Sequence, residues 1–526
     1  SRTMFFLRHS VFRSSGGSRS ASSTAMAIGA TWIGFSLLSW AHAQTGTAPQ
    51  PPAIDIPNTS LFQNQQDTAD RLWQNNQSRV QQSNKIDTPT ETSRRAGSSY
   101  ESALRALTQN PKDRLQQLSL EVLNAVNRQD WFGADRLLRI YARDPQHDPS
   151  LFDFVEASHD AAKGDYEAAI ESYRKVVQAS PGFTRSEIDL GRTLFIDNQL
   201  REAQEVFKRL QAQALPPVIG RHIQEYTTAL ENRTRPQFSL TLAWAREDNL
   251  NNANTVVNPC ALNWNGACFQ NNPGKKVGDS GVYFEASINK LWPISGHHGV
   301  VLRSLNYGNH YANQDSYDNL ASVNYLGYQY SSARTQFQLL PSFEYDREGR
   351  YTAYRAAGIR ASWRQQLSRR FQLEASLDYK HRDFSSHFGY LQGDLRGVGL
   401  FGSYALRPDW VLYANLLYRE SDAQNRVFAY GERIARIGVF KAFGNRFTVN
   451  LAYGYRQKRA EETYAFFGKR QRDHERSVYL NVTAPRWAWQ GFTPMLTYEY
   501  RNNRSSIPHA YDYEKNRITL GFNKTF

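Results

Sequence analysis

The chain ends in the decapeptide Arg517-Ile-Thr-Leu-Gly-Phe-Asn-Lys-Thr-Phe526, and this stretch decides the predicted fold. Ile518, Leu520, Phe522 and Phe526 occupy alternate positions, while polar or small residues fill most of the others. Side chains of a strand alternate between its two faces, so one face suits lipid and the other suits a polar interior. Such alternation, ending on an aromatic residue, is typical of the closing strand of an outer-membrane β-barrel. An ordinary amphipathic strand would look the same, so the prediction depends on what precedes it.

The same alternation recurs upstream, beginning with Gln237–Glu247 and continuing through segments such as Val282–Asn289. We count fourteen such segments, which leaves about 21 residues for each strand and its connection, enough for a strand that crosses a bilayer at a tilt. Short connections alternate with longer ones, as periplasmic turns alternate with external loops in such barrels. The sequence therefore predicts a fourteen-stranded antiparallel transmembrane β-barrel over residues 236–526. The longer predicted connections are 248–280, 309–317, 383–395, 459–472 and 501–514.

Composition supports a division of the chain into two halves. Of its 29 Tyr, 24 lie in the last 290 of 526 residues, and the mean hydropathy of the chain is only -0.64. No apolar run long enough for a membrane-spanning helix follows residue 43. Low hydropathy with many aromatic residues fits a membrane barrel, in which only alternate residues need to be apolar.

The first 43 residues read as a signal peptide for export. Four Arg precede the apolar stretch 25–38, and Ala41-His42-Ala43 supplies a cleavage site that makes Gln44 the first mature residue. Residues 44–112 are rich in Pro, Gln, Asn and Ser, which predicts a disordered periplasmic extension. In an exported chain, the closely spaced Cys260 and Cys268 predict a disulfide, because no His or further Cys lies nearby to complete a metal site.

Helical periodicity and an internal repeat mark residues 113–235. The segment Gly164-Asp-Tyr-Glu-Ala-Ala169-Ile-Glu-Ser-Tyr173 resembles the second half of a tetratricopeptide repeat. Ala134, Ala169 and Ala203 are spaced 35 and 34 residues apart, which matches that repeat length. We therefore expect an α-helical solenoid before the barrel, giving a two-domain α+β protein; a generic helical bundle is the alternative.

One charged surface of the predicted solenoid is a candidate site for binding a client protein. Arg185, Asp189 and Arg192 would lie on the inner helix of the last complete repeat, where such solenoids bind partners. A solvated helix face explains the same residues without a ligand.

Catalysis, cofactors and nucleic acid are not expected. The formal charge of +14 falls to +10 without the leader, but no basic cluster or base-stacking motif accompanies it. His381, Asp383 and His387 lie close together, yet no second carboxylate stands at a defined spacing from them. No phosphate-binding motif is present, so we expect no catalytic, metal-binding or cofactor-binding residues.

The architecture and one local segment together resemble the surface lipoprotein assembly modulator (Slam) family of Gram-negative outer membranes. The segment is Arg246-Glu-Asp248-Asn249-Leu250-Asn251, which is similar to that family's acidic-Asn-aliphatic-Asn motif, here Asp248, Asn249 and Asn251. The resemblance implies a translocator that delivers surface lipoproteins, or secreted haem- and iron-acquisition proteins, to the cell surface. It implies an outer-membrane barrel whose periplasmic repeats capture the client.

Two alternatives remain open at this point. A polysaccharide exporter also joins helical repeats to a barrel, and a simple porin would need no repeats. In every case insertion would require outer-membrane lipid and the barrel-assembly machinery, for which Thr519, Gly521 and Phe526 fit the recognition pattern. Lys524 departs from that pattern, standing where a second hydrophobic residue is usual, although a lysine near a strand end can reach the lipid headgroups.

Overall fold

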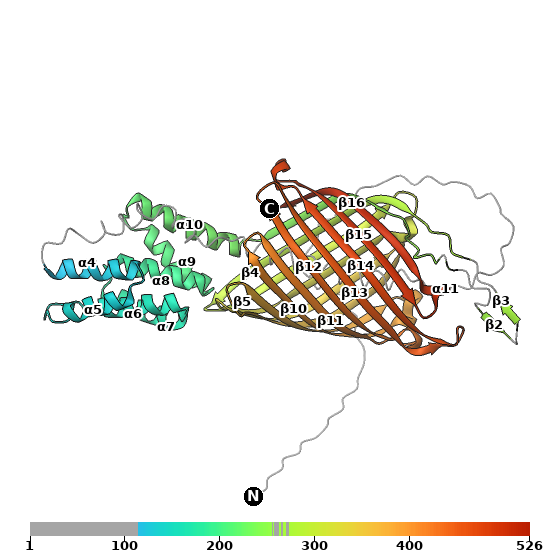
Figure 1. Ribbon diagram of the computed structural model, residues 1–526, viewed down its shortest axis with the longest axis horizontal. Coiled ribbons are helices and arrows are strands. Elements are labelled where there is room, and N and C mark those ends of the chain that lie inside the picture. The colour runs from blue at the N-terminus through green and yellow to red at the C-terminus, as the bar shows by residue number, and fades with distance from the viewer. Residues whose placement is uncertain (1–113, 255, 257–261, 265–266, 270–272) are drawn as a thin grey trace, which may run out of the picture. The chain divides into compact units, whose positions relative to one another are not determined.

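The computed structural model describes residues 114–254, 256, 262–264, 267–269 and 273–526, with a helical part followed by a β-barrel (Figure 1). The signal peptide predicted over 1–43 and the extension predicted over 44–112 lie outside the described residues. Cys260, one half of the predicted disulfide with Cys268, also lies outside the described residues. Among the described residues, no helix is both long enough and apolar enough to span a membrane.

The helices pack in consecutive pairs, as the 34-residue period predicts. Asp130 begins the second helix by accepting a hydrogen bond from the Gly133 amide (2.9 Å), and Gly164 ends the third with a left-handed φ of 85°. The helices are α4 (Arg114–Asn127), α5 (Trp131–Tyr141), α6 (Ser150–Lys163), α7 (Tyr166–Ala179), α8 (Thr184–Ile196), α9 (Leu200–Gln211) and α10 (Pro217–Thr234).

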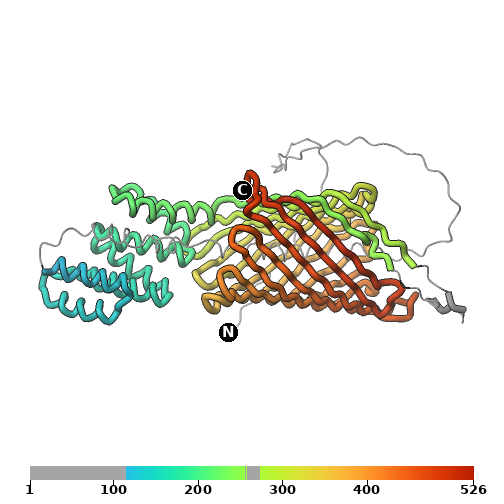
Figure 2. Tube along the Cα trace, turned by 45° about the horizontal axis from the view of Figure 1, so that its top comes forward, coloured from blue at the N-terminus to red at the C-terminus, as the bar shows by residue number. Residues whose placement is uncertain are grey.

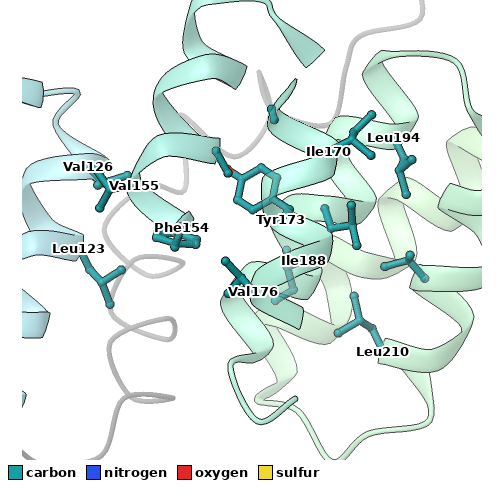
Figure 3. Close-up of a cluster of buried hydrophobic side chains, with 14 of the residues drawn as sticks. Leu123, Val126, Phe154, Val155, Ile170, Tyr173, Val176, Ile188, Leu194 and Leu210 are labelled. Carbon is teal, nitrogen blue, oxygen red and sulfur yellow. The ribbon is translucent and has the colours of Figure 1, made fainter. Parts of the chain in front are cut away.

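The helical core confirms the tetratricopeptide interpretation. Ala134, Ala169 and Ala203 are fully buried at equivalent places in three successive helix pairs, where a small side chain lets two helices approach closely. Tyr173 fills the gap between helices, as Figure 3 shows, and its ring packs edge-on against Phe154 with ring centroids 5.9 Å apart. Its buried hydroxyl shares a 3.0 Å hydrogen bond with Ser158, which satisfies the polar end of the side chain.

Fourteen antiparallel strands close into a barrel, which confirms the predicted strand number. Each strand pairs with its neighbours in the chain, and the first pairs with the last. A separate two-stranded sheet joins β2 (Leu262–Trp264) and β3 (Ala267–Phe269). The barrel strands are β1 (Gln237–Glu247), β4 (Asp279–Ser295), β5 (His298–Tyr311), β6 (Asn319–Ser331), β7 (Thr335–Glu348), β8 (Tyr351–Gln366), β9 (Phe371–Phe384), β10 (Gly393–Arg407), β11 (Trp410–Ser421), β12 (Tyr430–Phe443), β13 (Phe447–Tyr464), β14 (Lys469–Thr483), β15 (Thr493–Ser505) and β16 (Tyr513–Thr525).

Side chains alternate between the two faces of the barrel wall, whose strands run slanted in Figure 2. On β16, Leu520 is 49% exposed on the outside, while Thr519 is 3% exposed on the inside. The other strands repeat this arrangement, with Leu, Ile, Trp, Tyr and Phe exposed outward. An outward apolar surface around a polar interior is the pattern of a lipid-embedded barrel.

Several predicted strand ends were wrong, because the strands run further than their hydrophobic alternation. The connection predicted over 459–472 belongs mostly to the β13–β14 hairpin, where Thr463 pairs with Arg470. The strand predicted over Val282–Asn289 extends to Asp279–Ser295. Polar residues cover both faces where β13 meets β14, so no period-two signal marks the ends of these strands. The missed end of β4 instead carries the adjacent apolar residues Leu291 and Trp292, followed by Pro293, which interrupt the alternation.

The connections differ between the two ends of the barrel. At the end where α10 leads into β1, five of six connections have two to four residues, the exception being 484–492. At the opposite end, 248–278 is the longest connection and four others have seven or eight residues. The turns 349–350 and 465–468 break this trend with two and four residues.

The closing strand packs tightly against β1. The Phe526 amide donates to the carbonyl of Phe238 (2.8 Å), and Gly521 lies opposite Ala243. The ammonium of Lys524 lies 4.8 Å from the Phe492 ring centroid and 4.6 Å from that of Phe526. A cation between two aromatic faces is stabilised electrostatically, which accounts for a lysine at this apolar position.

Gly521→Ala should weaken the barrel. A Cβ at this position would lie 2.2 Å from the Leu242 carbonyl oxygen and 2.4 Å from the Ala243 Cβ. Relieving such overlap costs about 1–3 kcal/mol, so the urea midpoint of unfolding, followed by heat-modifiable electrophoretic mobility, should fall. Gly431→Ala in β12 is the control, because its Cβ would meet nothing closer than the Tyr418 hydroxyl at 3.8 Å. Equal midpoints for the two variants would show that β1 and β16 are not closely packed here.

Candidate functional site

Paired charges line the inner wall of the barrel. Arg360 on β8 binds Asp378 on β9 (2.7 Å), and Lys380 on β9 reaches Glu344 on β7 (2.5 Å). A similar chain continues around the wall, where Arg456 on β13 binds Glu475 on β14 (3.0 Å). A buried charge is tolerated when its partner is close, and an unpaired one is costly. The interior therefore presents both signs of charge rather than a uniformly basic surface.

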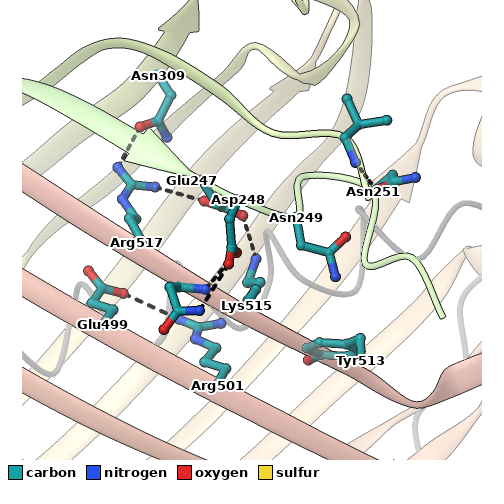
Figure 4. Close-up of polar contacts among 12 residues, drawn as sticks. Glu247, Asp248, Asn249, Asn251, Asn309, Glu499, Arg501, Tyr513, Lys515 and Arg517 are labelled. Atoms are coloured by element: carbon teal, nitrogen blue, oxygen red, sulfur yellow. Dashed lines mark hydrogen bonds and ion pairs between the residues drawn. The ribbon is translucent and has the colours of Figure 1, made fainter. Parts of the chain in front are cut away.

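The segment with the family motif lies where β1 ends and β16 begins, at the end of the barrel opposite α10 (Figure 4). On the inside, the Glu247 carboxylate binds the ammonium of Lys515 (2.7 Å) and the guanidinium of Arg517 (3.6 Å). The Asp248 carboxylate accepts hydrogen bonds from the Asn516 amide (2.7 Å) and from its side chain (2.9 Å). The last residue of β1, Glu247, and the next residue, Asp248, thus hold three consecutive residues of β16.

The two asparagines of the motif form hydrogen bonds that hold the segment after β1 in place. The Asn249 side chain is fully buried and donates to the Glu514 carbonyl (3.0 Å), while its oxygen accepts from the Ala253 amide (2.8 Å). Asn251 binds the returning segment, donating to the Lys275 carbonyl and accepting from the Val277 amide, both at 3.0 Å. We call Glu247, Asp248 and Asn249, with their β16 partners, the clasp.

The three residues predicted to bind a client lie together on α8. Arg185 forms an ion pair with Asp189 (2.9 Å) and donates to the Asn127 side chain of α4 (2.7 Å). Its guanidinium also lies 5.8 Å from the ring centroid of Phe154, so Arg185 links three helices. Arg192 is partly exposed on the same helix. Arg185 therefore helps to pack the helices together. Binding of a client by these three residues stays a prediction.

The helical repeats contact the barrel through two of its turns, which we call the junction. The His297 ring, in the β4–β5 turn, lies 2.6 Å from the Asp197 carboxylate at the end of α8. Asp197 also accepts from the Ala333 amide in the β6–β7 turn (3.2 Å). Glu202 on α9 accepts from the Gly296 amide (2.7 Å), next to His297.

No sequence pattern marks His297 as more than a residue of a solvated turn. Its partner Asp197 is 100 residues away, and neither residue belongs to a recognisable motif. In the structure the hydrogen bond with Asp197 raises the pKa of His297, although burial opposes this. Burial would raise the pKa of Asp197, but the hydrogen bonds from His297 and Gln199 outweigh it and lower that pKa.

Within the ranges that the structure describes, no group of three or more His, Cys, Asp or Glu residues is arranged to hold a metal ion. Of the three residues set aside as catalytic candidates on the sequence alone, His381 shares a 2.7 Å hydrogen bond with Asp394 in the neighbouring strand, and Asp383 accepts a hydrogen bond from Gln392. His387 instead stacks on Tyr351 with ring centroids 4.7 Å apart. These three residues do not converge on one site.

Two sequence models of known families match this chain. Residues 237–526 match the surface lipoprotein assembly modifier, and residues 102–207 match the N-terminal repeats of the same family. A hemophilin secretion modulator of Acinetobacter baumannii is 27% identical, covering 80% of this chain and 87% of the relative. Surface lipoprotein assembly modifier 1 of Haemophilus influenzae is 22% identical (74% and 80% covered), and that of Neisseria meningitidis is 24% identical (78% and 83% covered).

The junction should weaken as the pH rises. The raised pKa of His297 means that its contribution is complete below about pH 6.5 and is lost as the pH rises through that higher pKa. The contribution of Asp197 is complete above about pH 4 and is lost only as the pH falls through its lowered pKa. Hydrogen exchange of the Gly296 and Ala333 amides, corrected for intrinsic rates, should therefore speed up between pH 6 and pH 9.

His297→Asn should remove this pH dependence. His298→Asn is the matched control, since the His298 ring binds the Tyr328 hydroxyl (2.6 Å) instead of Asp197. An unchanged exchange profile in His297→Asn would show that another group controls the junction.

Proposed function

Because the chain belongs to the surface lipoprotein assembly modifier family, we propose that it is an outer-membrane translocator that delivers client proteins to the cell surface. The observation that carries the proposal is the direct connection of three helix pairs and α10 to a closed fourteen-stranded barrel. A passive porin has no use for a helical solenoid built to hold another chain. The barrel supplies the passage, and the repeats supply the surface that selects what passes.

The helical repeats are proposed to lie in the periplasm. Two observations support this orientation: α10 enters the barrel beside the chain's carboxy terminus, and the connections at that end are mostly short. Short turns face the periplasm in barrels of this kind. The clasp and the long connection 248–278 would then face the outside of the cell.

The proposed client is a surface lipoprotein or a secreted protein of haem or iron acquisition. The names of the relatives support both versions, since one modulates the secretion of hemophilin and others modify the assembly of surface lipoproteins. We propose that the partly exposed part of α8 around Arg192 contacts the client. The barrel-assembly machinery and outer-membrane lipids complete the proposed partners, and no catalytic step is proposed.

Deletion of the gene tests this function directly. Surface-exposed and secreted proteins should be quantified beside exported polysaccharide in the deletion strain and in a complemented strain. We expect at least one protein to lose most of its surface exposure or secretion, by roughly tenfold or more, with polysaccharide unchanged. If a glycan disappears while every protein stays at the surface, the chain is instead the polysaccharide exporter that its architecture also allows.

Arg192→Ala should weaken client capture. Loss of a charged contact is worth about 1.4 kcal/mol at a moderately buried site, which corresponds to roughly tenfold in Kd. The measurement is the affinity of the full-length protein for the client that the deletion identifies. Arg139→Ala is the control, because Arg139 on α5 is an exposed arginine paired with Asp135. Equal affinities for the two variants would remove this part of α8 from the binding surface.

A further inference from the structure

The ladder between β1 and β16, which we call the seam, is the shortest in the barrel. It joins nine residue pairs, from Ser239 with Thr525 to Glu247 with Arg517. The other thirteen neighbouring pairs of barrel strands join eleven to fourteen. In an apolar surrounding, backbone hydrogen bonds are the main force that holds two strands together. The seam is therefore the ladder that costs least to separate.

Side chains add little to the middle of the seam. On the inside, Ala243 lies opposite Gly521 and Ala245 opposite Thr519. On the outside, Trp244 lies opposite Leu520, and both are exposed. Contact between apolar side chains in lipid brings no hydrophobic stabilisation, because the lipid tails are equally apolar.

Polar side chains fasten the seam at its two ends instead. Near the carboxy terminus, the Asn523 side chain donates to the hydroxyls of Thr241 (2.8 Å) and Ser239 (3.2 Å). At the other end the clasp joins both strands, and its Glu247–Lys515 ion pair is 5% exposed on each side. If one residue of such a buried ion pair loses its partner, its charge is left uncompensated. The clasp therefore depends on the ion pair between Glu247 and Lys515.

We propose that the seam is the exit through which the client leaves the barrel, and that the clasp keeps it shut until then. This inference rests on the proposed function and assigns the motif around Asp248 a mechanical role. The clasp joins β16 to β1 and to the segment after β1, and its Arg517 also donates to Asn309 on β5 (2.5 Å), so these contacts must all break when the seam opens.

The occupant of the open seam is an extended segment of the client polypeptide. Parting the seam exposes two strand edges whose amides and carbonyls lose their partners within an apolar layer. A lipid chain cannot replace those hydrogen bonds, whereas an extended polypeptide can pair with either edge. Such pairing offsets the cost of opening.

A disulfide across the seam tests the route. In a Cys260→Ser/Cys268→Ser background, Ala245→Cys/Thr519→Cys places two cysteines directly opposite each other on β1 and β16. Opposite residues of antiparallel strands have Cα atoms about 4.5–5.5 Å apart, within the range of a disulfide. The matched control is Ser362→Cys/Ser376→Cys, since these serines face each other across β8 and β9 and are equally buried.

Oxidation of the seam pair should reduce surface delivery of the client at least tenfold, and a reductant should restore it. Oxidation of the control pair should leave delivery unchanged, with both variants checked for folded electrophoretic mobility. Normal delivery through an oxidised seam would overturn the inference while leaving the proposed function intact. Failure of the cysteine-free parent, and of the wild type beside it, to deliver any client would overturn the proposed function itself.

A photo-crosslinking residue at Leu520 tests the occupant. Leu520 faces outward in the middle of the seam, and Leu416 on β11 faces outward in a longer ladder, which makes it the control. During delivery, position 520 should form an adduct with the client at least tenfold more often than position 416. Adducts with lipid alone at position 520 would overturn the assignment of a client polypeptide to the open seam.

Discussion

Pairing of β1 with β16 is the constraint on which the rest of the barrel depends. Within an apolar layer a strand cannot leave its backbone groups unpaired, so a sheet that crosses the layer must have no free edge. Closure by antiparallel neighbours requires an even number of strands, and an even number brings the first residue of β1 and the last of β16 to the same end. The helical repeats and the carboxy terminus therefore meet at one end of the barrel, and the motif that ends β1 meets the start of β16 at the other.

Closure also explains the unusual composition of the chain. Only outward side chains face lipid, so the inward half of each strand is free to be polar, and the mean hydropathy of -0.64 reflects this. Inward charges are still partly removed from water, and they are arranged as cross-strand pairs such as Arg360 with Asp378. A passage lined with both signs of charge offers a polar chain many weak partners and no single strong one. Such a surface favours the passage of a polypeptide over its tight binding.

The sequence predicted the features that repeat and missed those that depend on distant partners. Period-two alternation revealed fourteen strands, and the spacing of Ala134, Ala169 and Ala203 revealed the helical pairs, because each signal recurs in every unit. Strand ends were misplaced where polar residues cover both faces, as in the β13–β14 hairpin. Asp248 and Asn249 were noticed only through a family resemblance. Their partners Asn516 and Glu514 lie more than 260 residues away, and no local pattern links positions so far apart.

The junction links the helical repeats to the β1 side of the seam. Besides the turn contacts, Lys290 on β4 donates to the Thr234 carbonyl of α10 (2.5 Å), and Arg201 on α9 donates to the Ile294 carbonyl of β4 (2.7 Å). β4 is also the other partner of β1, through eleven residue pairs. α10 continues directly into β1, so the helical repeats hold β1 and β4 together as one unit. A client that shifts the repeats would thus pull on the β1 side of the seam, and the load would fall first on the Asn523 hydrogen bonds at the near end and then on the clasp at the far end.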